Sequence, residues 1–147
     1  MHFQNEVYPS AGAQMEAMLE AGPEGPIVMV NLLKFKDKAA YEDGRACSLS
    51  GRDAYAIYAQ AVIGLVQQVG GRVLFAADVN FLSLGQAEPL WDQVALAEYP
   101  ERGAMVRMAM SPAYAEIAVH RTAGLEGQLN IETLPRFNLA DVIANSR

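Results

Sequence analysis

Asn31 and Asp78 are the polar residues best placed in this sequence to do chemistry. Asn31 interrupts the apolar run "IVMVNLLKF" (residues 27–35), and Asp78 lies in a second largely apolar stretch, "RVLFAADVNFLSL". An amide can orient a substrate carbonyl, and a carboxylate beside an apolar cavity has a raised pKa and can act as a general base. Each also has a structural interpretation. Asn31 could instead satisfy a neighbouring backbone group, and we leave both alternatives open; for Asp78 we favour a paired residue or a strand end.

His120 is the third catalytic candidate, since His2 is the only other histidine. An imidazole can move a proton or hold haem as an axial ligand, but a histidine at a helix boundary beside Arg121 is the simpler interpretation. Cys47 is the only cysteine and has no base near it in the sequence, so we interpret it as a bystander thiol. No histidine, cysteine or carboxylate cluster has ligand spacing, so we expect neither a metal site nor a cofactor.

Four further side chains are candidates for ligand binding: Trp91, Tyr99, Arg102 and Tyr114. The two aromatic residues that share a strand face, Trp91 and Tyr99, either line an aromatic pocket or pack in a core or interface. Arg102 lies four residues after Glu98, and a salt bridge between them is preferred to anion binding. Tyr114 is most simply a core residue of an amphipathic helix whose hydroxyl reaches outward.

The first half of the chain predicts a strand, a helix and a hairpin. Residues 27–35 are apolar at both alternating sets of positions, which is typical of a strand covered on both faces. Ser50 and Asp53 have capping-box spacing, and an apolar stripe then continues to Val69 before Gly70-Gly71. Residues 72–84 and 90–99 read as two strands joined by a turn at "GQAEP".

The second half predicts a broken helix and a last strand. Pro100 suits a first helical position, and Ser111-Pro112 starts a second helical piece that ends at Gly124. That piece carries Tyr114, Ile117, Ala118 and Arg121 on one stripe. "GQLNIETL" (residues 127–134) alternates between apolar and polar residues, as a half-buried strand does. A further helical turn is expected through Leu139, Val142 and Ile143.

The element order is strand, helix, strand, strand, helix, strand, which predicts an α+β fold of the ferredoxin-like βαββαβ type. This fold has an antiparallel four-stranded sheet with both helices on one face. We assign residues 26–134 to this domain, residues 1–25 to an N-terminal helical extension and residues 135–147 to a C-terminal tail. The uncovered face must include apolar residues, so we expect a homodimer formed sheet against sheet.

Composition narrows the classes of partner. The chain has 147 residues, of which 52% are hydrophobic, so a disordered chain is excluded. The formal net charge is −6 without a Lys/Arg cluster, which argues against nucleic acid and anionic membranes as partners. The start of the sequence lacks the pattern of a secretion signal, and with one cysteine a cytoplasmic location is expected. A small-molecule ligand and a second copy of the chain remain.

Several segments resemble a family of bacterial proteins of unassigned activity: "PIVMVNLLKFK", "GGRVLFAADV", "WDQVALAEYPERGAMVRMAMSPAY" and "HRTAGLEGQL". That family is similar to the dimeric α+β-barrel superfamily, which includes antibiotic-biosynthesis monooxygenases and ether-degradation accessory proteins. The resemblance covers roughly Pro26 to Leu134. It implies a dimer whose two sheets close a barrel around a pocket, in agreement with the homodimer expected above.

Two main functions follow as hypotheses. The first is a cofactor-independent enzyme, monooxygenase- or isomerase-like, acting on a small apolar carbonyl or phenolic compound. In it Asn31, with His120 or Asp78, handles a proton or an oxyanion inside the barrel. The second is a small-molecule-binding or accessory protein without turnover. A haem protein is a third hypothesis. The residues alone do not decide between the first two.

Overall fold

The computed structural model describes residues 11–20, 22–135 and 144. Its elements, in chain order, are α1 (Ala11–Leu19), β1 (Ile27–Phe35), α2 (Gly51–Gln68), β2 (Arg72–Asp78), β3 (Gln93–Tyr99), α3 (Arg102–Ala109), α4 (Pro112–Gly124) and β4 (Leu125–Thr133). Because α3 and α4 together take the place of one helix, β1 to β4 follow the ferredoxin-like βαββαβ order. The predicted fold class is therefore confirmed.

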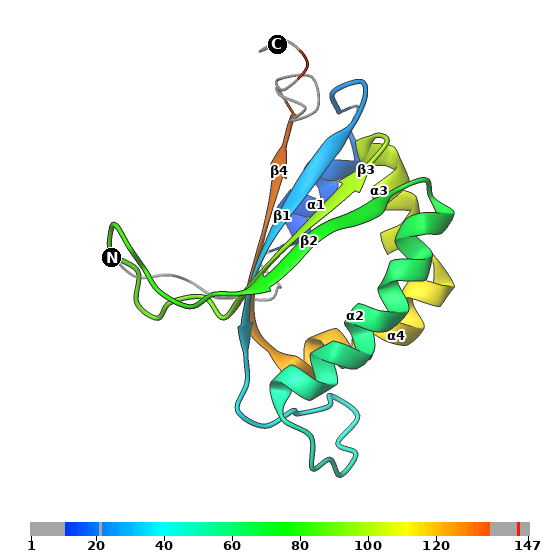
Figure 1. Ribbon diagram of the computed structural model, residues 1–147. Coiled ribbons are helices and arrows are strands. Elements are labelled where there is room, and N and C mark those ends of the chain that lie inside the picture. Colours follow the sequence, from blue (N-terminus) through cyan, green and yellow to red (C-terminus); the bar gives the residue numbers. More distant parts are fainter. Residues whose placement is uncertain (1–10, 21, 136–143, 145–147) are drawn as a thin grey trace.

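The four strands form one sheet in the order β2-β3-β1-β4, and all neighbouring strands are antiparallel. Figure 1 shows α2, α3 and α4 on one side of this sheet, and none of these three helices covers the other side. We call these the helix side and the bare side. Strand β1 lies at the centre and pairs with β3 and β4, so its side chains reach the middle of both sides.

The helix starts show which cap predictions were correct. The Ser50 hydroxyl accepts a hydrogen bond from the Asp53 N–H at 3.0 Å and begins α2 as predicted. Ser111 caps α4 in the same way, with Pro112 as the first helical residue. The prediction for Pro100 is wrong, because α3 begins at Arg102. Pro100 lies between the end of β3 at Tyr99 and the cap residue Glu101.

The β2–β3 hairpin is shorter than predicted, and its connection is longer. β2 ends at Asp78 and β3 begins at Gln93, so residues 79–92 form a connection that we call the arm. The arm extends away from the sheet toward its bare side (Figure 1). Phe81 and Leu84 on it are 77% and 89% exposed. The Val79 N–H still donates to the Asp92 carbonyl oxygen at 2.9 Å, and beyond it the apolar residues of the arm continue a strand-like pattern without forming a described strand.

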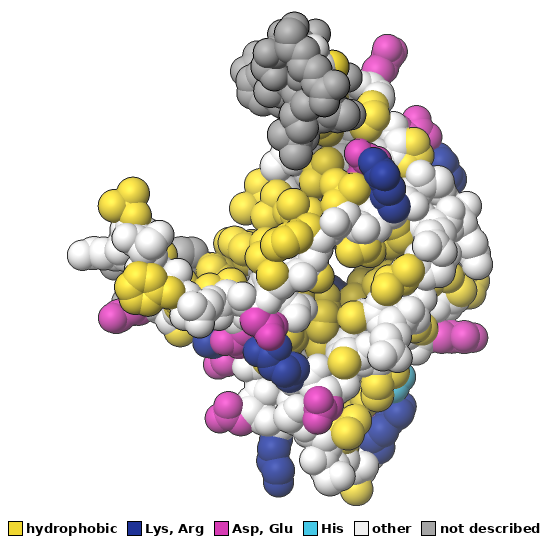
Figure 2. Space-filling view, viewed as in Figure 1, with side chains coloured by type: hydrophobic (Ala, Val, Ile, Leu, Met, Phe, Trp, Pro, Cys, Tyr) yellow, Lys and Arg dark blue, Asp and Glu magenta, His cyan; other side chains and the backbone are white. Residues whose placement is uncertain are grey.

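The alternation of β1 and β4 separates the two sides of the sheet. On β1 the residues Ile27, Met29, Leu33 and Phe35 are buried toward the helices. The register then places the polar residues Gln128, Asn130 and Glu132 of β4 on the helix side. The other alternating set of β4 faces the bare side, and it consists of Leu129, Ile131 and Thr133. Figure 2 shows hydrophobic side chains gathered on this side of the sheet.

Some predictions concern the ends of the chain. The N-terminal extension that we expect to be helical contains α1, and its residues 1–10 lie outside the described residues. The helical turn predicted through Leu139, Val142 and Ile143 also lies outside them. Within residues 11–20, 22–135 and 144, no helix combines the length and apolar character that crossing a membrane requires.

Candidate functional site: a hollow between the sheet and the helices

The core between the sheet and the helices is divided into two hydrophobic clusters. One contains Ile27, Met29, Val66, Ala97, Tyr99 and Met108. The other contains Leu33, Phe35, Tyr55, Tyr58 and Leu125. Two side chains from the helices, Val62 and Tyr114, pack against both clusters. Asn31 belongs to neither cluster, although it lies between Met29 and Leu33 on the same side of β1.

Four small or polar residues form a row across the sheet between the two clusters. The strand register pairs Ala76 with Ala95, Ala95 with Asn31, and Asn31 with Asn130. This row has no large apolar side chain to fill the space below the helices. Because side chains of this size leave room in front of them, a gap in the packing is expected at this level of the sheet.

The exposure of these residues shows that solvent reaches the gap. Ala97 is only 9% exposed, whereas Ala95, on the same strand and side, is partly exposed. Asn31 is likewise partly exposed between Met29 at 3% and Leu33 at 0%. Figure 2 shows the surface hollowed between the sheet and α2. We call this space the mid-sheet hollow; its floor is Ala76, Ala95, Asn31 and Asn130, and Val62 and Tyr114 lie above it.

A chain of hydrogen bonds runs along the β4 end of the mid-sheet hollow. Asn31 Nδ2 donates to the carbonyl oxygens of Met29 and Ala95, each at 3.2 Å. The buried Gln128 donates from Nε2 to Oδ1 of both Asn31 and Asn130, and Arg121 Nε donates to Gln128 Oε1 at 2.7 Å. The network fixes three amide side chains and brings the guanidinium of α4 against the sheet.

Two tyrosine hydroxyls meet beside the same space. The hydroxyl oxygens of Tyr58 and Tyr114 lie 3.1 Å apart, and their rings meet edge to face. Burial is the main cause of a raised pKa at Tyr58, and it raises the pKa of neighbouring Tyr55 to about 12. The nearby Arg121 charge opposes this effect at both residues. Tyr55 and Tyr58 are therefore neutral at pH 7, so they can donate hydrogen bonds but do not act as bases.

Asn31 combines both interpretations made from the sequence. Its amide satisfies backbone carbonyls, as the structural interpretation requires, and it also borders a solvent-accessible space. Its direction differs from the prediction. Asn31 faces the helices and not the bare side, so it would not line a pocket closed between two sheets. Strand β1 is apolar at both alternating sets of positions, which is why its pattern could not reveal this direction.

Asp78 does not fit the role of a general base. Its carboxylate accepts hydrogen bonds from Arg52 at 2.7 Å and Gln93 at 3.2 Å, and its side chain is 66% exposed. The hydrogen bond from Arg52, followed by that from Gln93, lowers the pKa of Asp78, which is the opposite of the shift that a base in an apolar cavity needs. The interpretation as a paired strand end is the one the structure supports.

His120 is engaged outside the mid-sheet hollow. Its Nδ1 lies 2.7 Å from the Tyr41 hydroxyl, and the two rings meet edge to face. Tyr41 belongs to the connection between β1 and α2, which also bonds to the end of α4 through the Ala40 N–H and the Ala123 carbonyl. His120 therefore helps to hold this connection, and it takes no part in the Asn31 network.

The predicted ligand-binding residues occupy different places. Arg102 pairs with Glu132 and not with Glu98, which pairs with Arg72, so the predicted Glu98–Arg102 bridge is wrong. Tyr99 is a buried member of the first cluster, where burial raises its pKa to about 12. Trp91 is also buried. Of the four, Tyr114 is the one that borders the mid-sheet hollow. In the described part of the chain, no three histidine, cysteine or carboxylate side chains are grouped to hold a metal ion.

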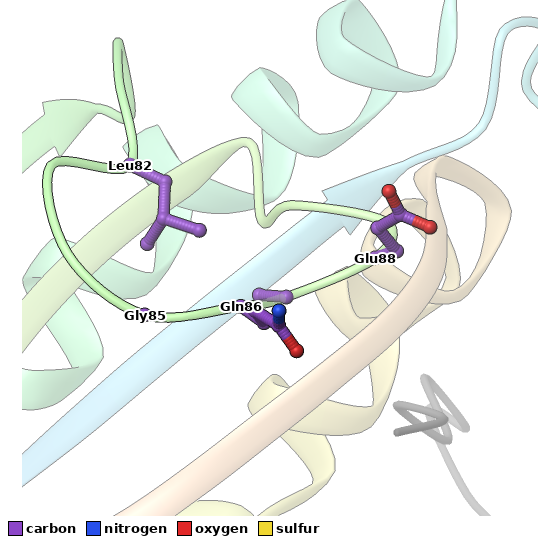
Figure 3. A pocket seen from close by; sticks show the side chains of 5 residues that line it. Leu82, Gly85, Gln86 and Glu88 are labelled. Atoms are coloured by element: carbon purple, nitrogen blue, oxygen red, sulfur yellow. The ribbon is translucent and has the colours of Figure 1, made fainter.

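A second hollow lies within the arm. Figure 3 shows it on the inner side of the connection, where it is lined by Leu82, Gly85, Gln86, Ala87 and Glu88. All of these residues come from the arm, and none of them is a predicted site residue. The mid-sheet hollow brings together residues of four strands and two helices, so we take it as the candidate site.

Sequence reasoning missed Arg121, Gln128 and Asn130 as site residues. Two signals pointed to them. Arg121 lies on the same helical stripe as Tyr114 and Ile117, where an apolar residue is expected. Gln128 and Asn130 form the polar set of the last strand, and a polar set on the side that faces the helices indicates a polar interior. The pairing of β4 with β1 places these two residues on the helix side, and the sequence of the strand by itself does not give this direction.

The chain matches a known family over most of the ferredoxin-like core. Residues 45–132 match the model of a family described as a domain of unknown function, DUF1330. The chain belongs to the DUF1330 family. A crystal structure of RPA0582, a protein of unknown function from Rhodopseudomonas palustris, is 31% identical to this DUF1330 chain, with a TM-score of 0.77. The match covers 92% of this chain and 100% of that chain.

More distant structures share the fold of this DUF1330 chain. At3g17210 from Arabidopsis thaliana is 16% identical with a TM-score of 0.51, and the match covers 76% of this chain and 97% of that chain. SnoaB, a cofactor-independent oxygenase from Streptomyces nogalater, is 12% identical with a TM-score of 0.50, over 78% and 97% of the two chains. At these identities the likeness shows the fold alone. No curated protein sequence matches the chain.

Proposed function

We propose that this protein binds a small, mostly apolar molecule in the mid-sheet hollow. The observation that carries the proposal is the opening in the core at Ala95 and Asn31, between two clusters that are otherwise well packed. A gap of this kind between the sheet and the helices costs packing energy, so a ligand that fills it recovers dispersion contacts. Apolar walls with a few fixed polar groups are typical of small-molecule sites.

Binding without turnover is the form of this proposal that the site chemistry favours. The two carboxylates next to the row of floor residues, Glu132 and Asp78, are paired with Arg102 and Arg52, and His120 is engaged with Tyr41. The polar groups that remain are amides, an arginine and tyrosine hydroxyls. Such groups orient an oxygen atom, but they do not remove a proton at pH 7.

A cofactor-independent enzyme acting on a small carbonyl or phenolic compound is the second candidate. The paired hydroxyls of Tyr58 and Tyr114 favour it, because one donates to the other and the remaining O–H can donate to a negative charge that develops on a substrate oxygen. The fold likeness to SnoaB, which is a cofactor-independent oxygenase, adds an association with that chemistry.

The experiment is a titration with 3-phenylpropionate, followed by NMR of the labelled methyl groups. We expect the methyl signals of Ala76 and Ala95, on the floor of the mid-sheet hollow, to shift on binding. The side chains of Val30 and Leu96 face the bare side, so their methyl signals serve as the internal control. Shifts confined to the bare side would contradict the proposal. New signals from a converted probe would favour the enzyme instead.

We also propose that the protein is a homodimer joined through the bare side of its sheet. The exposed apolar residues there, which include Phe75 and Ile131, form a face that water would otherwise cover. Two-fold symmetry lets the same face serve both copies. In such a dimer each protomer keeps its own mid-sheet hollow, because that space lies on the helix side.

A further inference from the structure

Arg121 differs from the other arginines that the structure describes. The structure describes six arginines including Arg121, and the other five form ion pairs: Arg45 with Asp43, Arg52 with Asp78, Arg72 with Glu98, Arg102 with Glu132 and Arg107 with Glu101. Among the described residues, Arg121 has no carboxylate within ion-pair distance. It is only partly exposed, so water does not fully solvate its charge.

The hydrogen-bond network leaves several N–H donors available at and beside Arg121. The amide oxygens of Gln128, Asn31 and Asn130 all accept hydrogen bonds within the network. The Arg121 guanidinium uses Nε for Gln128, and within the described residues its two Nη groups bond to no partner. The Nδ2 of Asn130 is likewise an unused donor. These donors favour a ligand that offers oxygen acceptors.

We infer that the ligand of the mid-sheet hollow is a small apolar compound with one carboxylate, and that Arg121 binds this group. A guanidinium holds a carboxylate through two parallel N–H donors, and the pairing is strongest where water is partly excluded. The apolar part of the ligand then lies over Ala95 and Ala76. This inference rests on the proposed function and specifies the chemical class of its ligand.

A matched pair of probes, 3-phenylpropionate and 3-phenylpropionamide, tests this inference. The two have nearly the same shape and differ in charge. We expect the acid to bind at least tenfold more tightly to the wild-type protein at pH 7, as measured by isothermal titration calorimetry. The chain has a formal net charge of −6, which disfavours anions in general, so such a preference must arise locally.

Variants then show which residue causes the preference for the acid over the amide. Arg121→Gln should bind both probes with equal affinity, and Arg121→Lys, which keeps the charge without the planar pair of donors, should keep part of the preference. Arg107→Gln is the control, since Arg107 is exposed and pairs with Glu101 outside the hollow. Circular dichroism checks the folding of each variant, and the acid–amide comparison on the wild type stands if one of them fails to fold.

Each outcome supports or overturns the inference. Equal binding of acid and amide to the wild type would overturn the role of Arg121 and leave the proposed function standing. An unchanged preference in Arg121→Gln would overturn it as well. Absence of binding by both probes at millimolar concentration would contradict the proposed function itself, and the inference with it.

Discussion

At the scale of single residues, the Arg102–Glu132 ion pair fixes one end of the candidate site. Nε and Nη2 of Arg102 donate to the two carboxylate oxygens of Glu132 at 2.7 and 2.6 Å. Glu132 follows Asn130 on the helix side of β4, so this pair ties α3 to the edge strand next to the mid-sheet hollow. Both side chains are largely buried, which sets this pair apart from the exposed pairs of the surface.

The pH dependence of this pair has a definite sign. The hydrogen bonds from Arg102 lower the pKa of Glu132 below its ordinary value of 4.5. A carboxylate with a lowered folded-state pKa stabilises the fold at neutral pH and loses this effect as the pH falls through that pKa. We therefore expect Glu132→Gln to lower the Tm at pH 7 by about 2–4 °C, and the difference from the wild type to disappear in acid.

Thermal unfolding followed by circular dichroism between pH 7 and pH 3 measures this difference. The control is Glu101→Gln, which removes the partner of exposed Arg107 and should change the Tm much less. A loss in Glu132→Gln that stays the same at every pH would show that the carboxylate charge is not the cause.

Residue type was easier to predict than residue direction. Asn31 could be identified because an amide inside an apolar strand needs partners, and those partners exist. The side to which it points could not be predicted, because both alternating sets of β1 are apolar. The pairing of Arg121 with Gln128 depends on how α4 crosses β4, and spacing along one element carries no information about that crossing.

At the scale of elements, the arm offers the additional surface that a dimer requires. Four strands about 20 Å long present roughly 400 Å² on the bare side. A stable interface buries about 800 Å² on each partner. The arm extends toward the bare side and carries Phe81 and Leu84, which are almost fully exposed (Figure 1). We therefore expect the arm of each copy to contact the other copy.

The double variant Phe81→Ser, Leu84→Ser tests this contact. Light scattering after size-exclusion chromatography should give the wild type about twice the 15.9 kDa mass of one chain. In the variant the dissociation constant should rise at least tenfold, because a few anchor side chains carry most of the binding energy of an interface. Met110→Ser is the control, since Met110 is exposed beside α3 and α4, away from the bare side. A monomeric wild type would contradict the proposed homodimer. A variant whose dissociation constant is unchanged would contradict the role of the arm.

The starts of α2 and α4 followed from local chemistry, whereas the start of α3 and the extent of the hairpin did not. Ser50 and Ser111 begin their helices through hydrogen bonds to residues three positions ahead, so nearby sequence is sufficient to locate them. The extent of β2 depends on where β3 stops pairing with it, at Asp78 and Gln93. Beyond that point the apolar alternation continues in the arm. The same pattern occurs in strands and in contact surfaces, so it does not show where β2 ends.

At the scale of the whole molecule, the order of elements was sufficient to predict the fold but not the side of the sheet that holds the site. A bare apolar face suggested a hollow shared between two sheets. The structure instead opens its core on the helix side, where Ala76 and Ala95 leave space above the sheet. The bare side and the site are thus separate surfaces, and dimerisation and binding can be tested independently.

Leucine substitution at two alanines of β3 tests the existence of the mid-sheet hollow most directly. Ala95 and Ala97 lie on the same strand and the same side, but only Ala97 is closely packed. Urea denaturation at equal protein concentration should show Ala95→Leu within about 1 kcal/mol of the wild type, and Ala97→Leu less stable by about 1–3 kcal/mol. Ala95→Leu should also no longer bind 3-phenylpropionate. Equal destabilisation by both substitutions, with binding unchanged in Ala95→Leu, would contradict the hollow.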